Sequence, residues 1–408
     1  WKFYSDSTLC KFISRTLDNN RDLLTAASRM QQFRAMYGVD KANMLPQINV
    51  SIYGNDETND YSGTGISHDR EFGFKVPISW EINLLGSAVW AKKKGKANYL
   101  ASAEDYRAMQ VALIAQTAEA YYRLVALENE LSIIRRTVES RKESLRMAKI
   151  RFEGGLTSET VYQQAMVEYS SAASLVPNLE RQITMARNAL TLLMGEFPQE
   201  TLSAGKKNLT RIQIERLPIG LPSQLLMRRP DIRASQQRLS AAKANVGYAY
   251  AERFPSLQLG FTPGFENNEL KDFLKSPFTY LVGTVAGPVF DFGRRKGKYK
   301  ASVAEYEQSM YQYEKTVIQA FTEVNTAINT YIDAQQSCVL KAALCEAAAK
   351  YNHLARLQYH AGTLNYIDVL DAQRRFFDAQ IDESNAIRDE YIALITLYKV
   401  LGGGGSGN

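Results

Sequence analysis

Two carboxylates, Asp368 and Asp371, have a spacing that would let them act together. They are three residues apart, so they share one face in the first turns of a predicted helix. Carboxylates grouped in this way can attract and select cations. Their alternative role is local, because acids at the start of a helix complement the positive end of its dipole. The spacing by itself leaves both roles open.

No arrangement of residues predicts catalysis, a cofactor or a metal site. The segment 293–299 is similar to a phosphate-binding loop, but one spacer residue is missing and Tyr299 stands where Ser or Thr is required. His353 and His360 are too far apart along a helix to share a metal ion, and the methionines form no cluster. We therefore expect a protein that is not an enzyme and needs no cofactor.

The three cysteines do not indicate a disulfide framework. Cys338 and Cys345 lie seven residues apart on one predicted helix, too far for a bridge. Cys10 falls in an apolar pattern, which favours a buried structural thiol over a lipid-modified one. The chain begins abruptly near an amphipathic helix, so we expect that any export signal or lipid anchor lies upstream of residue 1.

A repeat covers most of the 408 residues and supplies the elements that carry these side chains. Gly86, Gly155 and Gly195 recur at one constant shift as glycines 293, 362 and 402. In each copy a helix-forming run of more than sixty residues leads to a tight turn, and a returning helix follows. The apolar steps on the outgoing runs average 3.5 residues, which indicates a coiled-coil seam. Each copy is therefore predicted to be a long helical hairpin.

Alternation with a period of two follows Pro46 and Pro255, the prolines that end the incoming helices. The first copy predicts strands around residues 48–52 and 72–80, joined by a polar loop over 54–70. The second copy predicts strands at 257–261 and 280–290. Two isolated hairpins in a soluble sandwich would bury little surface and leave open edges.

Membrane crossing by helices is not expected, because no apolar run approaches the ~18 residues that a spanning helix needs. Four strands of about ten residues suit a bilayer, yet the smallest known membrane barrel has eight. Several chains must therefore contribute four strands each to one closed, rotationally symmetric barrel.

The predicted organisation has five parts. They are an equatorial segment (1–17), a first repeat (18–194, with a β-hairpin at 47–81 and a helical hairpin at 88–194), an equatorial belt (195–226), a second repeat (227–401, with a β-hairpin at 255–291 and a helical hairpin at 294–401) and a flexible tail (402–408). The fold class is α+β, with an internal duplication.

Three segments resemble motifs of the TolC-like outer membrane factors of resistance-nodulation-division efflux systems. They are Leu217-Pro218 through Arg228-Arg229-Pro230-Asp231, Ile367-Asp368 through Asp371 to Arg374, and Val176-Pro177 through Gly195. The resemblance spans essentially the whole chain. It implies a homotrimer with a twelve-stranded transmembrane β-barrel in the outer membrane of a Gram-negative bacterium and a periplasmic helical coiled-coil barrel. The implied partners are a periplasmic adaptor, an inner-membrane proton-driven transporter and outer membrane lipid.

The resemblance also assigns roles to residues. Asp368 and Asp371 match the acids that constrict the family's aperture, which favours the gate over the helix-dipole role. The residues expected to dock the adaptor are those at the two tips: Arg151, Gly154, Gly155, Leu156, Thr157, Gly362, Thr363 and Leu364.

A membrane-interface set follows the predicted strands, where basic residues would meet anionic headgroups beside aromatic side chains. It comprises Trp80, Trp90, Lys92, Lys93, Phe290, Arg294 and Arg295. Nucleic-acid binding is not expected, because these basic clusters have no aromatic stacking platform.

The leading hypothesis is a passive exit duct of a tripartite efflux pump. An exit duct of a type I protein-secretion system is the alternative within transport, and a soluble coiled-coil scaffold is the alternative from another class. The Arg-Arg-Pro-Asp segment favours efflux over secretion.

Overall fold

The structure is a computed structural model that describes residues 6–61, 65–198, 228–287 and 289–403. It divides into two units. Unit 1 contains the chain up to Ala26, Tyr106–Pro230 and the chain from Val317 onward, and unit 2 contains Ala27–Asp105 and Asp231–Thr316. Most of the belt predicted for 195–226 and of the tail predicted for 402–408 lies outside the described residues.

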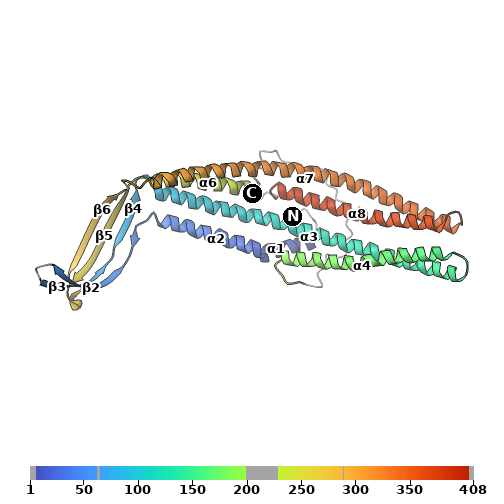
Figure 1. Cartoon of the computed structure of the whole chain (residues 1–408), viewed down its shortest axis with the longest axis horizontal. Helices are drawn as coiled ribbons and strands as arrows, with labels where there is room; N and C mark the ends of the chain where they lie inside the picture. Colours follow the sequence, from blue (N-terminus) through green and yellow to red (C-terminus); the bar gives the residue numbers. More distant parts are fainter. Residues whose placement is uncertain (1–5, 62–64, 199–227, 288, 404–408) are drawn as a thin grey trace. The chain divides into compact units, whose positions relative to one another are not determined.

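Helices make up most of the described chain (Figure 1). They are α1 (Ser7–Asn19), α2 (Arg21–Ala42), α3 (Ser87–Glu153), α4 (Glu159–Leu193), α6 (Pro230–Ala251), α7 (Arg294–His360) and α8 (Tyr366–Val400), with a short 3-10 turn at Leu270–Asp272. Both α3 and α7 contain 67 residues and end at the glycine turns that the repeat predicts. None of these described helices combines the length and the apolar character that crossing a membrane requires.

In unit 1, α4 packs back along α3, and α8 packs back along α7 (Figure 1). The predicted seam is the buried side of this packing: Leu124 and Ile134 of α3 are 0% and 2% exposed, and Cys338 of α7 is 1% exposed. Small and apolar side chains at this spacing allow two helices to pack closely over many turns. Cys10, in contrast, is only half-buried.

Unit 2 contains one antiparallel sheet. Its segments are β1 (Gln47–Ile48), β2 (Ser51–Tyr61), β3 (Gly65–Lys75), β4 (Ile78–Asn83), β5 (Ser256–Asn267) and β6 (Pro277–Ala286). Because β1 and β2 both pair with the β3–β4 stretch, and β5 pairs with that stretch and with β6, the sheet has the width of four strands.

The strand register gives the sheet two different faces. Ile78 lies opposite Phe261, which lies opposite Leu281, so apolar side chains line up across the strands. Three positions along each strand, Glu81, Gln258 and Thr284 line up on the other face. The apolar and polar alternation predicted from the sequence is confirmed.

The prediction of a loop over residues 54–70 is wrong, since β2 and β3 extend through most of this segment. Their ladder runs from Ser51 opposite Lys75 to Tyr61 opposite Gly65, while β5 pairs with β3 only from Phe72 onward. The outer part of the hairpin is therefore a two-stranded ribbon without a buried face. Such a ribbon needs no apolar alternation, so its polar sequence resembled that of a loop.

Each repeat contains a junction where a returning helix ends beside the start of an incoming one. In the first, Asn20 is 4% exposed and donates from Nδ2 to the carbonyl of Leu193 at 2.8 Å, while its Oδ1 accepts the N–H groups of Asp22 and Leu23. In the second, Arg229 donates to the carbonyl of Val400 and pairs with Glu323 at 2.7 Å. Different side chains thus satisfy equivalent helix ends, and Asn20 is the N-cap of α2.

Both helical hairpins turn through the same glycine motif. After α3, Gly155 has a φ of +71° and donates to the carbonyl of Phe152, while Leu156 donates to that of Arg151. After α7, Gly362 has a φ of +76° and donates to the carbonyl of Tyr359, while Thr363 donates to that of Gln358. This pair of hydrogen bonds is a Schellman cap, in which the left-handed position favours glycine.

We predict that Asn20→Ala lowers the free energy of unfolding of the helical part by ~1–2 kcal/mol, because two helix ends lose their partners. Asn20→Asp is the matched variant, since it keeps the acceptor for α2 and loses only the donor to Leu193. Thermal unfolding of the purified protein should rank wild type above Asn20→Asp and Asn20→Asp above Asn20→Ala. Equal transition temperatures would contradict the junction's role.

We predict that Gly362→Ala weakens the second turn by ~1–2 kcal/mol, because alanine is strained at this positive φ. Amide hydrogen exchange in peptides covering the turn should become faster. Gly297→Ala is the control, since Gly297 lies within α7 and has no heavy atom within 4 Å of an added Cβ. Exchange that is accelerated equally in both variants would contradict this account of the turn.

Candidate functional site

The tips of the two helical hairpins are exposed and contain small side chains. Leu156 is 81% exposed, and Gly154 and Gly155 beside it are exposed. At the other tip Gly362 and Thr363 are exposed. Thr157 of the first tip and Leu364 of the second, which occupy equivalent positions, are half-buried. The tips offer backbone groups and one protruding apolar side chain to a partner.

Arg151 connects the two tips rather than standing free beside one of them. Its guanidinium donates to the hydroxyl of Tyr359 at 2.6 Å and lies 5.7 Å from the centre of that ring. The contact combines a hydrogen bond with a cation–π interaction, and it joins the end of α3 to the end of α7. A partner that uses Arg151 must compete with Tyr359.

The two predicted gate acids lie in the first turns of α8, both half-buried. Asp371 accepts a hydrogen bond from Arg375 at 2.8 Å, and this contact raises the pKa of Arg375 above its ordinary value. Asp368 lies in the first turn, where a carboxylate also complements the helix dipole. In a single chain the negative charge of Asp371 is therefore partly offset by Arg375. The position of Asp368 is compatible both with a gate and with a complement to the helix dipole.

An ion cluster that the sequence reading missed lies farther along the same helices. Arg141 of α3 is 6% exposed, and it donates to the backbone carbonyl of Glu168 at 2.8 Å and to its carboxylate at 3.0 Å. Arg374 of α8 contacts the other carboxylate oxygen of Glu168 at 2.8 Å. A single acid on α4 thus holds cations from two other helices.

Opposing effects act on the pKa of the buried Arg141. Burial lowers the pKa of Arg141, Glu168 raises it and the like charge of Arg374 lowers it again. A buried charge with no counter-charge would be costly, so the buried Arg141 depends on Glu168, whereas Arg374 is mostly exposed. The sequence signal was an arginine at position 141 that interrupts an otherwise apolar seam.

The aromatic members of the membrane-interface set have different surroundings in unit 2. Trp80 is 39% exposed and donates from Nε1 to the carbonyl of Met44 at 3.0 Å. The ring of Trp90 lies against Gly247, where a Cβ would come within 2.4 Å of it. Trp90 therefore packs α3 against α6, and glycine at 247 leaves the space for the ring.

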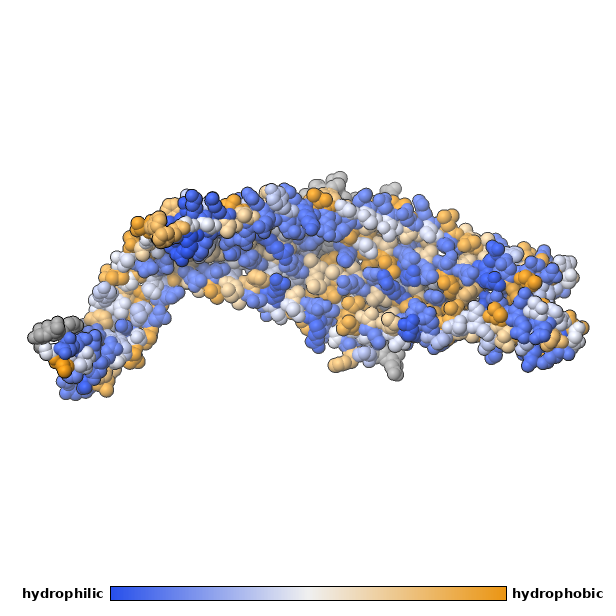
Figure 2. Space-filling view, in the orientation of Figure 1, coloured by the Kyte–Doolittle hydropathy of each residue, from blue (hydrophilic) through white to orange (hydrophobic). Residues whose placement is uncertain are grey.

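The remaining members of the membrane-interface set differ in exposure and in their contacts. Phe290 is 76% exposed and packs edge to face with Phe292 at 4.6 Å, and Figure 2 shows apolar side chains gathered where the sheet meets the start of α7. Lys93 lies 4.3 Å from the centre of the Trp90 ring, Lys92 is half-buried and Arg294 is exposed. Arg295 donates to the carbonyl of Glu252 and pairs with Asp291, so its charge is used in contacts within the chain.

Across the described residues, no group of three or more His, Cys, Asp or Glu side chains is placed to hold a metal ion.

Comparison with known proteins extends over nearly the whole chain. The family model described as "Outer membrane efflux protein" matches residues 12–196 and 221–403. The solvent efflux pump outer membrane protein SrpC of Pseudomonas putida is 30% identical over 99% of this chain and 87% of its own. The cation efflux system protein CusC of Escherichia coli is 29% identical over 99% of this chain and 88% of its own.

Solved structures are similar to the same extent. The outer-membrane channel OprN superposes with a TM-score of 0.93 at 27% identity, over 99% of this chain and 92% of that one. The MtrE outer membrane channel of Neisseria gonorrhoeae has a TM-score of 0.89 at 27% identity, over 97% and 89%. With both hairpins, the intervening strands and the tips inside the matched regions, the chain belongs to the outer membrane efflux protein family.

Proposed function

We propose that this protein is the passive exit duct of a tripartite efflux pump, gated at the tips of its helical hairpins. As an outer membrane efflux protein it is a transport component of the outer membrane and not an enzyme. The observation that carries the proposal is the combination, in one chain, of a sheet with one apolar face and of long hairpins whose second tip begins with two acids.

The sheet supports a trimeric barrel. Its apolar face is exposed in the single chain, with Ile52 at 75% and Leu281 at 78%. In the described part of the sheet, β2 pairs only with β3, and β6 only with β5, so each has an open edge. Three chains that join edge to edge would form twelve strands without an open edge and turn the apolar faces to lipid.

The acids at the start of α8 support a cation-selective aperture. In a trimer, Asp368 and Asp371 would form two stacked rings of carboxylates, which attract cations and repel anions. The Arg375 side chain limits the charge of the second ring. Opening at this end would be driven by partners, because the chain belongs to a family of transport components and not of enzymes.

We predict that the double variant Asp368→Ala, Asp371→Ala raises single-channel conductance in planar bilayers and weakens cation selectivity, because both acid rings are lost. Asp389→Ala is the control, since Asp389 is an exposed acid of α8 distant from the tip. A large conductance that is unchanged in the double variant would retain the channel and reject the gate. Absence of current in both proteins would reject the duct.

The ion cluster supports a closed arrangement in which α8 is tied to α3 and α4. Glu168 is the shared partner, and Arg374 is the link that is open to solvent, with 56% of its side chain exposed. We propose that this link and the Arg151 contact with Tyr359 hold the two hairpins together until partners separate them.

We predict that Arg374→Ala raises the conductance and leaves thermal stability nearly unchanged, because an exposed ion pair contributes little to stability. Arg181→Ala is the matched control, since Arg181 is an exposed arginine of α4 that contacts Asn178 of its own helix. Arg141→Ala should instead destabilise the fold by several kcal/mol, because Glu168 loses its buried partner. Conductance that is equal in Arg374→Ala and Arg181→Ala would contradict the link.

The partners proposed here are two further copies of the chain, a periplasmic adaptor at the tips, an inner-membrane resistance-nodulation-division transporter and outer membrane lipid. The exposed tips with Leu156 at their surface support the docking of an adaptor. The exposed Phe290 and Arg294 support contact with lipid headgroups. Trp90, which packs against Gly247, and Arg295, which donates to the carbonyl of Glu252, make contacts within unit 2 instead.

A further inference from the structure

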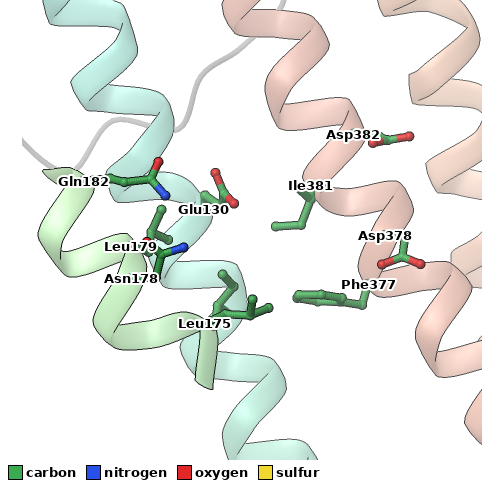
Figure 3. A pocket seen from close by; sticks show the side chains of 10 residues that line it. Glu130, Leu175, Asn178, Leu179, Gln182, Phe377, Asp378, Ile381 and Asp382 are labelled. Carbon is green, nitrogen blue, oxygen red and sulfur yellow. The ribbon is translucent and has the colours of Figure 1, made fainter. Parts of the chain in front are cut away.

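A pocket of about 270 Å³ lies in unit 1 between α3, α4 and α8 (Figure 3). It is separate from the tips and from the gate acids. Its walls include Glu130 of α3, Leu175 and Gln182 of α4, and Phe377 and Ile381 of α8. The volume is near the lower end of the ~300–1,000 Å³ that is usual for small-molecule sites, so the pocket suits a small ligand.

One side of the pocket is apolar. In Figure 3, Phe377 and Ile381 extend from α8 toward α4, and Leu175 extends toward them. The guanidinium of Arg141 lies 5.5 Å from the centre of the Phe377 ring, so the ring already takes part in one cation–π contact within the protein. An aromatic ring and two aliphatic side chains at this position can hold the apolar part of a ligand.

The ionisable side chains that line the pocket are all acids. Asp382 pairs with Lys341 of α7, whereas Glu130 forms no ion pair with any described residue. Arg388 is near enough to favour ionised Glu130, but its guanidinium is occupied by Asn385 and Asp389. Burial raises the pKa of Glu130, while the charge of Arg388 acts in the opposite direction.

We propose that this pocket binds small organic monocations that carry an aromatic or branched apolar group. The cationic centre would lie beside Glu130, with the apolar group against Phe377, Ile381 and Leu175. A carboxylate and an aromatic ring that line one pocket can together recognise quaternary ammonium groups. Gln182 would supply the polar contact at the rim. A bare metal ion is less suited to the site, because so much of the wall is apolar.

The proposal goes beyond the function proposed above and does not rest on it. Binding to the wall of unit 1 requires neither conduction nor the gate acids. A failure of the conductance experiments would leave this site untouched, and a failure of the binding experiment would leave the duct untouched.

The test is isothermal titration of the full chain, purified in detergent, with benzyltrimethylammonium chloride. We expect saturable binding that weakens about tenfold or more in Glu130→Gln and in Phe377→Leu. The first variant loses the negative charge that faces the cation, and the second loses the aromatic ring that holds the apolar group. Glu139→Gln is the matched control, since Glu139 is an exposed acid on the same helix and does not line the pocket. Its affinity should equal that of the wild type.

Benzyl alcohol serves as the neutral ligand and should bind at least tenfold more weakly than the cation, because it has no charge for Glu130. Absence of saturable binding by the wild type would overturn the proposal. So would equal affinity in Glu130→Gln and wild type, or an equal loss in Glu139→Gln. Glu130→Gln is nearly isosteric, so its unchanged thermal transition will show that the variant is folded.

Discussion

Burial of a narrow seam along α3 and α7 is the interaction on which the helical part of this protein depends. A helix of 67 residues has little stability of its own in water and requires a partner along its length. The returning helices α4 and α8 supply that partner because the seam keeps small or apolar residues at most of its positions, such as Ala148 and Cys338. The turns and junctions follow from this need, since each returning helix must start and stop in register with the long one.

Arg141 shows what happens where the seam is interrupted. A charge at a buried position has to be neutralised, and Glu168 does so from α4 while also holding Arg374 of α8. Because the buried guanidinium needs a counter-charge, ion pairs to one carboxylate connect three helices near the tips. This arrangement places a stabilising interaction and a proposed control of opening on the same carboxylate, with one buried arginine for the fold and one exposed arginine that can be released.

In the proposed barrel, the sheet would depend on lipid and on further copies of the chain. Its apolar face, with Ile52 and Leu281, is exposed, and its outer strands have open edges in the described residues. A soluble protein would bury such a face against a second layer. An outer membrane protein can leave it to lipid, provided that copies of the chain satisfy the edges.

Much of this architecture followed from the sequence alone, because it is local. The glycine turns, the seam and the two faces of the sheet are periodic patterns, and each depends on residues a few positions apart. The ribbon at the end of β2 and β3 was misread because it has no buried face and hence no pattern. Only the tertiary structure decided which residues meet across the chain: Glu168 with Arg374, Trp90 with Gly247, and Glu130 with Phe377 around one pocket. These pairs are separated by more than 150 residues and arise from helix packing, which periodicity does not specify.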